Sequence, residues 1–319
     1  REGLIEQLGE ALQRRRRVNL LPATHSHYSP GIHRVLYAVG RQAYEREQAA
    51  AVFSLSAETP LQFRFSLAGM ARHFSTEIPA HRTLPLADLE EMVHHWMQRH
   101  ANWLLIIQEV NDARAAQPVR ELVRRFPHGS FLVAGHYSHA DFGASVSLPA
   151  LDPEASVELL VQEVGLEIRA LGLDRDIFRK LAIEVGGLTT VLEAAVGALR
   201  QRRLPWFQVE NELDQAREWY RQHRATLPLG QDWSDTAGGF LRLNLKGLSP
   251  SAAALARLSA FLAPSAIPLW LPGEAESVLR SAQEGLTGAP FGELDFPLQA
   301  AADELRDVMI GRVHHEQLE

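Results

Sequence analysis

Fourteen histidines and no cysteine limit the metal chemistry available to this chain. Several histidines occur as close pairs, namely His25/His27, His94/His95, His136/His139 and His314/His315. A zinc site needs three or four ligands that converge on one ion, and the HExxH pattern that places two histidines on one helix face is missing. We therefore expect these histidines to be packed or to face solvent, and we expect no metal site.

Nucleophilic and acid–base residues do not form a hydrolase pattern either. Ser138 lies close to His139 and Asp141, but the GxSxG turn that exposes a nucleophilic serine is missing. Glu90 and Glu91 belong to a predicted amphipathic helix, where they are typical surface charges rather than an acid–base pair. The sequence therefore predicts no catalytic residue.

The 319 residues carry a formal net charge of −7, with 46% hydrophobic and 22% charged residues. This composition is typical of a folded globular protein, and the negative balance disfavours a dedicated nucleic-acid binder. The one basic run, Arg14–Arg17, is expected to be a solvated helix end, with a phosphate or acidic-partner contact as the alternative. No apolar run approaches the roughly 20 residues of a membrane span. With no cysteine, the chain fits a reducing compartment, so we expect a cytoplasmic protein without membrane contact.

The first 150 residues alternate between apolar runs and amphipathic helical patterns. Buried strands are predicted at 50–55, 103–107, 130–134 and 144–148. Helices are predicted at 2–17, 32–47, 60–74, 86–100 and 119–126, with a turn-rich segment at 18–30. Strands that alternate with helices predict a parallel sheet flanked by helices.

After Pro149 the strand patterns stop and helical patterns take over. Helices are predicted at 153–164, 174–185, 188–202 and 207–224. A segment rich in Gly, Pro and Asp at 226–235 precedes further helices at 235–246, 249–263, 273–283 and 294–308, and the last residues suit a short strand and turn. The chain is therefore expected to continue as two helical segments.

Six local patterns, taken in order, resemble the STAND NTPases with an NB-ARC core over roughly residues 28–318. WLLIIQEVND (103–112) resembles the Walker B strand, and GSFLVAGH (129–136) resembles the sensor strand. LPALDPEASVELL (148–160) resembles the start of the first helical domain, and IEVGGLTTVLEAAVGAL (183–199) resembles the GLPL helix. Residues 248–272 and 304–318 resemble the two ends of a winged-helix domain.

The resemblance implies an α/β P-loop-NTPase-like parallel-sheet domain followed by a helical domain and a winged-helix-like domain. The expected boundaries are an N-terminal helix and linker at 1–34, a degenerate NB-ARC nucleotide-binding-like domain at 35–150, a helical domain at 151–228 and a winged-helix-like domain at 229–319. Because the chain begins at Arg1 instead of Met, we expect it to be part of a longer protein.

The resemblance places the phosphate-binding loop at residues 54–71, after the first predicted strand. A working loop is rich in glycine, because its backbone amides close around phosphate oxygens, and a lysine reaches the β- and γ-phosphates. This segment instead contains Pro60, which lacks an amide hydrogen, and Glu58, which repels phosphate. Arg64 falls near the lysine position, but neither of the chain's two lysines lies in this segment. We expect a loop that no longer cradles a triphosphate.

The other family positions are altered too. Gln108 stands where the Walker B aspartate holds Mg²⁺, and a neutral amide is a poor ligand for that hard cation. Glu109 follows it, but adjacent strand residues face opposite ways. His136 replaces the sensor arginine, and the early FxGR signature reads YSPGIH at 28–33. The expected vestigial positions are Arg64, Gln108, Glu109, His136, Thr189 in place of the proline of GLPL, and His314, which resembles the winged-helix histidine that contacts the β-phosphate.

These losses favour a pseudo-NTPase that regulates and oligomerises, relaying a signal between an effector and a sensor region outside this chain, without a bound cofactor or nucleic acid. Its expected partners are proteins, with self-association as one further case. One alternative is a switch that still binds ADP or ATP with Mg²⁺ through Arg64, Glu109 and His136. A second alternative is a winged-helix transcription regulator, which the single basic residue of helix 249–263, Arg257, disfavours.

Overall fold

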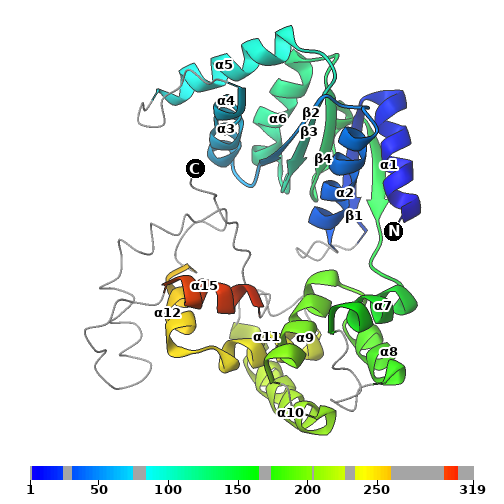
Figure 1. Cartoon of the computed structure of the whole chain (residues 1–319), viewed down its shortest axis with the longest axis vertical. Coiled ribbons are helices and arrows are strands. Elements are labelled where there is room, and N and C mark those ends of the chain that lie inside the picture. Colours follow the sequence, from blue (N-terminus) through cyan, green and yellow to red (C-terminus); the bar gives the residue numbers. More distant parts are fainter. Residues whose placement is uncertain are drawn as a thin grey trace. The chain divides into compact units, whose positions relative to one another are not determined.

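The computed structural model describes residues 2–23, 31–74, 84–164, 174–202, 205–226, 234–259 and 298–307. The chain divides into two compact units, residues 1–150 and 151–319 (Figure 1). Each unit has buried apolar clusters of its own, so each is described separately. Within the described residues, no helix combines the length and the apolar character that crossing a bilayer requires.

The first unit is built on a five-stranded parallel sheet (Figure 1). Its strands are β1 (Arg17–Pro22), β2 (Ala51–Ser56), β3 (Trp103–Gln108), β4 (Ser130–Ala134) and β5 (Ala144–Leu148). They follow the order β2-β3-β4-β1-β5, and every neighbouring pair is parallel. The predicted parallel α/β sheet is confirmed, with all four predicted strands present and a fifth added.

The added strand, β1, corrects the sequence interpretation of the N-terminal region. Residues 17–22 were expected at the end of a helix and in a turn-rich segment, but they lie between β4 and β5. Asn19 is placed opposite Val133 of β4 and Ser145 of β5. β1 is therefore an interior strand of the sheet, although it precedes residue 35, where the sequence placed the start of the α/β domain.

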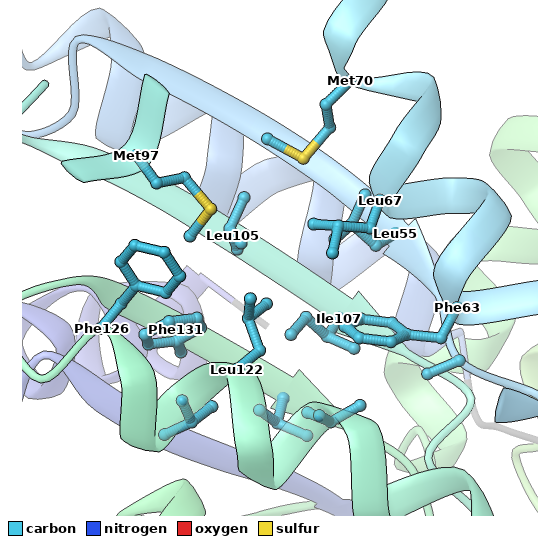
Figure 2. Close-up of a cluster of buried hydrophobic side chains, with 14 of the residues drawn as sticks. Leu55, Phe63, Leu67, Met70, Met97, Leu105, Ile107, Leu122, Phe126 and Phe131 are labelled. Carbon is cyan, nitrogen blue, oxygen red and sulfur yellow. The ribbon is translucent and has the colours of Figure 1, made fainter. Parts of the chain in front are cut away.

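Helices cover both faces of this sheet. α1 (Glu2–Arg15) and α2 (Ile32–Glu45) pack on one face, while α3 (Pro60–Gly69), α5 (Leu86–Arg99) and α6 (Ala113–Arg125) pack on the other, next to the short helices α4 (Ala71–Phe74) and η1 (Ala140–Phe142). Successive strand residues point to opposite faces. Leu104 and Ile106 therefore enter the α1–α2 core, whereas Leu105 and Ile107 enter the other core (Figure 2).

Trp103 anchors the start of β3 within this second core. Its indole Nε1 donates hydrogen bonds to the backbone oxygens of Met97, at 3.2 Å, and His100, at 3.1 Å. Its ring packs edge-on against Phe126 and Phe131, two residues of the cluster drawn in Figure 2. Gly129 makes room for the indole, because a Cβ atom there would lie 2.0 Å from a ring carbon.

The described residues of the second unit form helices. They are α7 (Pro153–Val164), α8 (Arg175–Glu184), α9 (Thr189–Arg202), α10 (Trp206–His223), η3 (Arg224–Thr226), α11 (Asp235–Gly247), α12 (Pro250–Ser259) and α15 (Leu298–Asp307). Side-chain caps begin α8 and α11, where Asp174 accepts from the amide of Ile177 and Ser234 accepts from the amide of Ala237. The predicted helix 273–283 and the C-terminal strand and turn lie outside the described residues.

Candidate functional site

The carboxyl edge of the sheet, where the strands end, is the candidate site. In open parallel sheets ligands bind outside the carboxyl ends of the strands, at the point where the strand order reverses. Here β1 is followed by β2 at the far edge of the sheet, whereas β4 is followed by β5 on the other side of β1. The reversal therefore lies between β1 and β4, and the loop after β1 borders it.

A chain of hydrogen bonds joins α2, β3 and β2 at this edge. His33, in the first turn of α2, donates from Nδ1 to Oε1 of Gln108, the last residue of β3, at 2.5 Å. The Nε2 of Gln108 donates in turn to Oγ of Ser54 on β2 at 3.0 Å. Both ends of the Gln108 carboxamide are thus engaged, which fixes its orientation.

Acidic side chains lie beside these hydrogen bonds. Ser56 donates from Oγ to Oε2 of Glu109 at 2.6 Å. Glu109 has a left-handed backbone, with φ of 68°, so it turns back toward the end of β2 although it follows Gln108 directly. Burial, and then the Glu109 carboxylate, raise the pKa of Glu58 above its ordinary value. These acidic groups make the end of β2 and β3 unfavourable for a phosphate.

The connection at the strand-order reversal is not the segment that the family resemblance assigned to the phosphate-binding loop. A P-loop connects a strand to a helix through GxxxxGK[ST]. At the strand-order reversal that connection is β1–α2, where residues 26–33 read SHYSPGIH, and not residues 54–71, which follow the edge strand β2. Gly31 alone matches the motif, with Ile32 at the lysine position and His33 at the Ser/Thr position. Residues 24–30 lie outside the described residues.

Arg64, expected beside the triphosphate, belongs to a surface ion pair. Its Nε and Nη2 donate to Oε1 and Oε2 of Glu90, both at 2.8 Å, which joins α3 to α5. The hydrogen bond with Glu90 raises the pKa of Arg64. Arg64 has no contact with the hydrogen-bond chain of Gln108, so its expected role at the phosphate position is not supported.

The remaining expected positions are scattered. The backbone amide of His136, just after β4, donates to Oδ1 of Asn111 at 3.2 Å, which places this residue at the same carboxyl edge as Gln108 and Glu109. Thr189 is buried at the start of α9 in the second unit. His314 lies outside the described residues. The structure therefore brings three of the six positions to one edge, and it adds His33, Ser54 and Ser56 to them.

The described part of the chain contains no group of three or more His, Cys, Asp or Glu side chains that could hold a metal ion. The cluster around Asp141 is an ion-pair network, in which Arg120 and Arg124 contact Oδ2 at 3.0 Å and 2.9 Å. The hydrogen bond from Arg120 lowers the pKa of Asp141. Ser138 pairs with the hydroxyl of Ser145 at 3.3 Å. This network holds η1 against α6.

The residues at this edge differ from those that bind a magnesium nucleotide in P-loop NTPases. In P-loop NTPases the P-loop Ser/Thr and the Walker B aspartate hold Mg²⁺, while the lysine contacts the phosphates. Here the corresponding His33 and Gln108 are hydrogen-bonded to each other, and Ile32 is only 5% exposed.

No protein-family model matches this chain, and no curated protein matches its sequence. Two solved proteins of Aeropyrum pernix are similar to it: ORC1 in complex with DNA (15% identity, 97% of this chain and 83% of that chain, TM-score 0.45) and ORC2 with ADPNP and ADP (13% identity, 96% and 85%, TM-score 0.44). A STAND protein with a tetratricopeptide repeat sensor from Pyrococcus horikoshii is 14% identical over 95% of this chain and 53% of its own, with a TM-score of 0.39. These scores are too low to establish a shared fold.

Proposed function

We propose that this chain is a non-hydrolysing pseudo-NTPase module of the STAND/NB-ARC type, which regulates and oligomerises instead of turning over ATP. The observation that carries the proposal is the 2.5 Å hydrogen bond between His33 and Gln108. We assign these residues to the two positions that hold Mg²⁺ in a working P-loop enzyme. A metal ion cannot occupy the space between them while their side chains are joined.

Charge supports the same conclusion. Phosphate sites combine backbone amides with positive side chains. The lysine position is instead a buried isoleucine, Ile32. The acidic residues Glu58 and Glu109 follow β2 and β3, and β3 ends at Gln108, which contacts His33. Bringing a nucleotide polyphosphate to this edge would place like charges together, with no lysine to compensate.

Two compact units offer a physical basis for a regulatory role. β5 ends at Leu148 and α7 begins at Pro153, so a short connection joins the units. Switches of this kind change the relative positions of such units. A ligand shifts the balance between two states only when it binds them with different affinity. Without nucleotide, a protein partner or a second copy of the chain would supply that difference.

Nucleotide binding to the purified chain tests this proposal. We expect ATP and ADP, each with Mg²⁺, to leave the melting temperature unchanged and to give no heat in calorimetric titration. A ligand that binds the native state at one hundred times its Kd stabilises by about 2.7 kcal/mol, so true binding would be evident. A clear rise in melting temperature with Mg–ADP would overturn the proposal and favour the nucleotide-binding switch. Loss of that binding in His33→Ala, with retention in Arg64→Ala, would place the nucleotide after β1.

Oligomerisation is tested by light scattering across a wide range of protein concentration. We expect the mass to rise with concentration or on addition of the partner that the module regulates. A mass that stays monomeric under both conditions would remove oligomerisation from the proposal.

A further inference from the structure

A cavity of about 750 Å³ lies at the opposite, amino edge of the sheet. Its wall is formed where α1, α2, α5 and α6 end and where β3 and β4 begin. Small-molecule sites commonly occupy about 300–1,000 Å³. The cavity is therefore large enough for a ligand, and it is separate from the carboxyl-edge site.

Its wall is strongly basic. Arg16, Arg99 and Arg125 line the cavity together with His100 and His128, and none of the residues described as lining it is an aspartate or glutamate. This lining contrasts with the overall charge of the chain, which is −7. An anion is thus the ligand that the charge of this wall favours.

The three arginines also differ from others in the chain. Many described arginines contact a carboxylate at close range, as in the pairs Arg64–Glu90 at 2.8 Å, Arg179–Glu154 at 2.7 Å and Arg221–Asp235 at 3.0 Å. Among the described residues, Arg16, Arg99 and Arg125 make no ion pair with a carboxylate. Their charge is therefore not neutralised by acidic side chains of the described chain.

The position of these arginines has a competing explanation, because basic residues often compensate the backbone carbonyls at helix C-termini. Arg16 does not do so, since its Nη1 donates to the backbone oxygen of His128, which lies in the turn between α6 and β4. The carbonyls of Met97 and His100 are instead satisfied by the indole of Trp103. A guanidinium has five N–H donors. Even after the bond to His128, Arg16 keeps donors for a ligand.

Arg99 and Arg125 keep more of their N–H donors available than Arg16 does. The guanidinium carbon of Arg125 lies 5.9 Å from the centre of the Phe126 ring, a contact that leaves its N–H groups available. Arg99 is exposed at the last turn of α5. Guanidinium groups bind carboxylate and phosphate oxygens in pairs. The wall therefore offers several guanidinium groups that can bind one ligand in a bidentate manner.

Backbone strain marks the same place. Arg16 and Asn102 both line the cavity, and they directly precede β1 and β3. Both have left-handed backbones, with φ of 57° and 66°. Asparagine adopts this conformation readily, but it is unfavourable for arginine and persists there only where the surrounding structure holds it. The turn at Arg16 is thus held in a fixed conformation at the cavity wall.

We propose that this cavity binds a small multivalent oxyanion, a molecule with clustered phosphate or carboxylate groups, through Arg16, Arg99 and Arg125. This proposal does not depend on the loss of nucleotide hydrolysis at the other edge. It gives the Arg14–Arg17 run a specific role for one of its members, Arg16.

Titration calorimetry on the full chain at low salt tests the proposal, with pyrophosphate and citrate as separate probes and without Mg²⁺. We expect saturable binding of at least one probe, and the probe that binds shows whether phosphate or carboxylate groups are preferred. The double variant Arg99→Gln/Arg125→Gln should weaken binding at least tenfold. Its matched control is Arg41→Gln/Arg72→Gln, which removes the same charge from residues of the first unit outside the cavity wall and should bind normally.

Three results would overturn the proposal. The unmodified chain could bind neither probe. The control variant could lose as much affinity as the cavity variant, which would indicate an effect of net charge alone. In a parallel titration, duplex DNA could bind while neither small anion does, in which case the wall would belong to a nucleic-acid surface. Circular dichroism of both double variants establishes that they fold, since all four substituted side chains are exposed.

Discussion

His33 and Gln108 are 75 residues apart in the chain, yet His33 Nδ1 donates to Gln108 Oε1 at 2.5 Å. The bond joins the first turn of α2 to the last residue of β3 at the carboxyl edge of the sheet. Under the proposed function, it joins two positions that would hold a metal ion in a P-loop enzyme. The stability of this edge should therefore depend on the pair itself.

Replacing Gln108 with leucine should destabilise the chain by about 1–2 kcal/mol. Half-buried His33 would lose a hydrogen-bond partner, and exposed Ser54 would lose one as well. Urea unfolding measures the change. Ser54→Ala, which removes one bond, serves as the milder control. If His33→Ala and Gln108→Ala proved additive in the double variant, the two side chains would not be coupled.

Glu58 should make stability depend on pH. Its pKa is raised in the folded state, so its favourable contribution is complete below the unfolded pKa and is lost as pH rises through the folded value. Glu58→Gln is therefore expected to stabilise at pH 7 by less than about 1 kcal/mol and to have no effect well below the ordinary pKa. Melting curves at both pH values test this, with the exposed Glu91→Gln as control. A gain that persisted at low pH would contradict the charge explanation.

Asp141 should show the opposite dependence. The hydrogen bond from Arg120 lowers its folded pKa, so its contribution is present above the unfolded pKa and disappears as pH falls through the folded value. Asp141→Asn should cost about 1 kcal/mol at pH 7, and the difference from the unmodified chain should shrink in acid. Urea unfolding at several pH values measures it. The same loss at every pH would show that packing of η1, and not the ion pair, is responsible.

Asn19 is fully buried on β1, and neither polar atom of its side chain has a hydrogen-bond partner among the described residues. An unsatisfied buried amide is costly, and a β-branched residue suits an interior strand. Asn19→Val should therefore raise the free energy of unfolding by about 1 kcal/mol, whereas Val18→Asn, at the adjacent buried position, should lower it. Destabilisation by Asn19→Val would indicate that a bound water satisfies the amide.

Gly129 is the position most sensitive to one added methyl group near Trp103. A Cβ atom would lie 2.0 Å from the indole, which is only 4% exposed and held by two hydrogen bonds. Gly129→Ala should cost about 2 kcal/mol through overpacking. Gly3→Ala, in open space on α1, should instead stabilise slightly by improving helix propensity. Equal effects of the two variants in thermal unfolding would rule out the steric explanation.

Local pattern was sufficient for most elements. The predictions of residues 130–134 as a strand and 153–164 as a helix agree with the bounds of β4 and α7. The apolar run at 103–107 correctly predicted β3. Asp174 caps α8, the helix predicted at residues 174–185. These features are encoded by neighbouring residues, through the period of apolar side chains and the side chains that cap helices.

β1 was missed because its local signal is weak. Four arginines precede or begin the strand and the polar Asn19 interrupts its apolar run, so residues 17–22 resemble a helix end followed by a turn. Its burial comes from partners far along the chain, β4 and β5. The short apolar run VNLL, followed by Pro22, a largely polar segment and then Gly31 at a helix start, was the signal that could have revealed it.

By itself, the sequence determined an alternating α/β region, a following helical region and the absence of lysine where a phosphate would need one. Tertiary structure alone decided which loop borders the strand-order reversal, that Gln108 meets His33, that Arg64 pairs with Glu90 and that three arginines line one cavity. The reason is physical. Hydrophobic period and capping act over a few residues, whereas strand order and ion pairing depend on which distant segments fold together, and several pairings are compatible with the same local pattern.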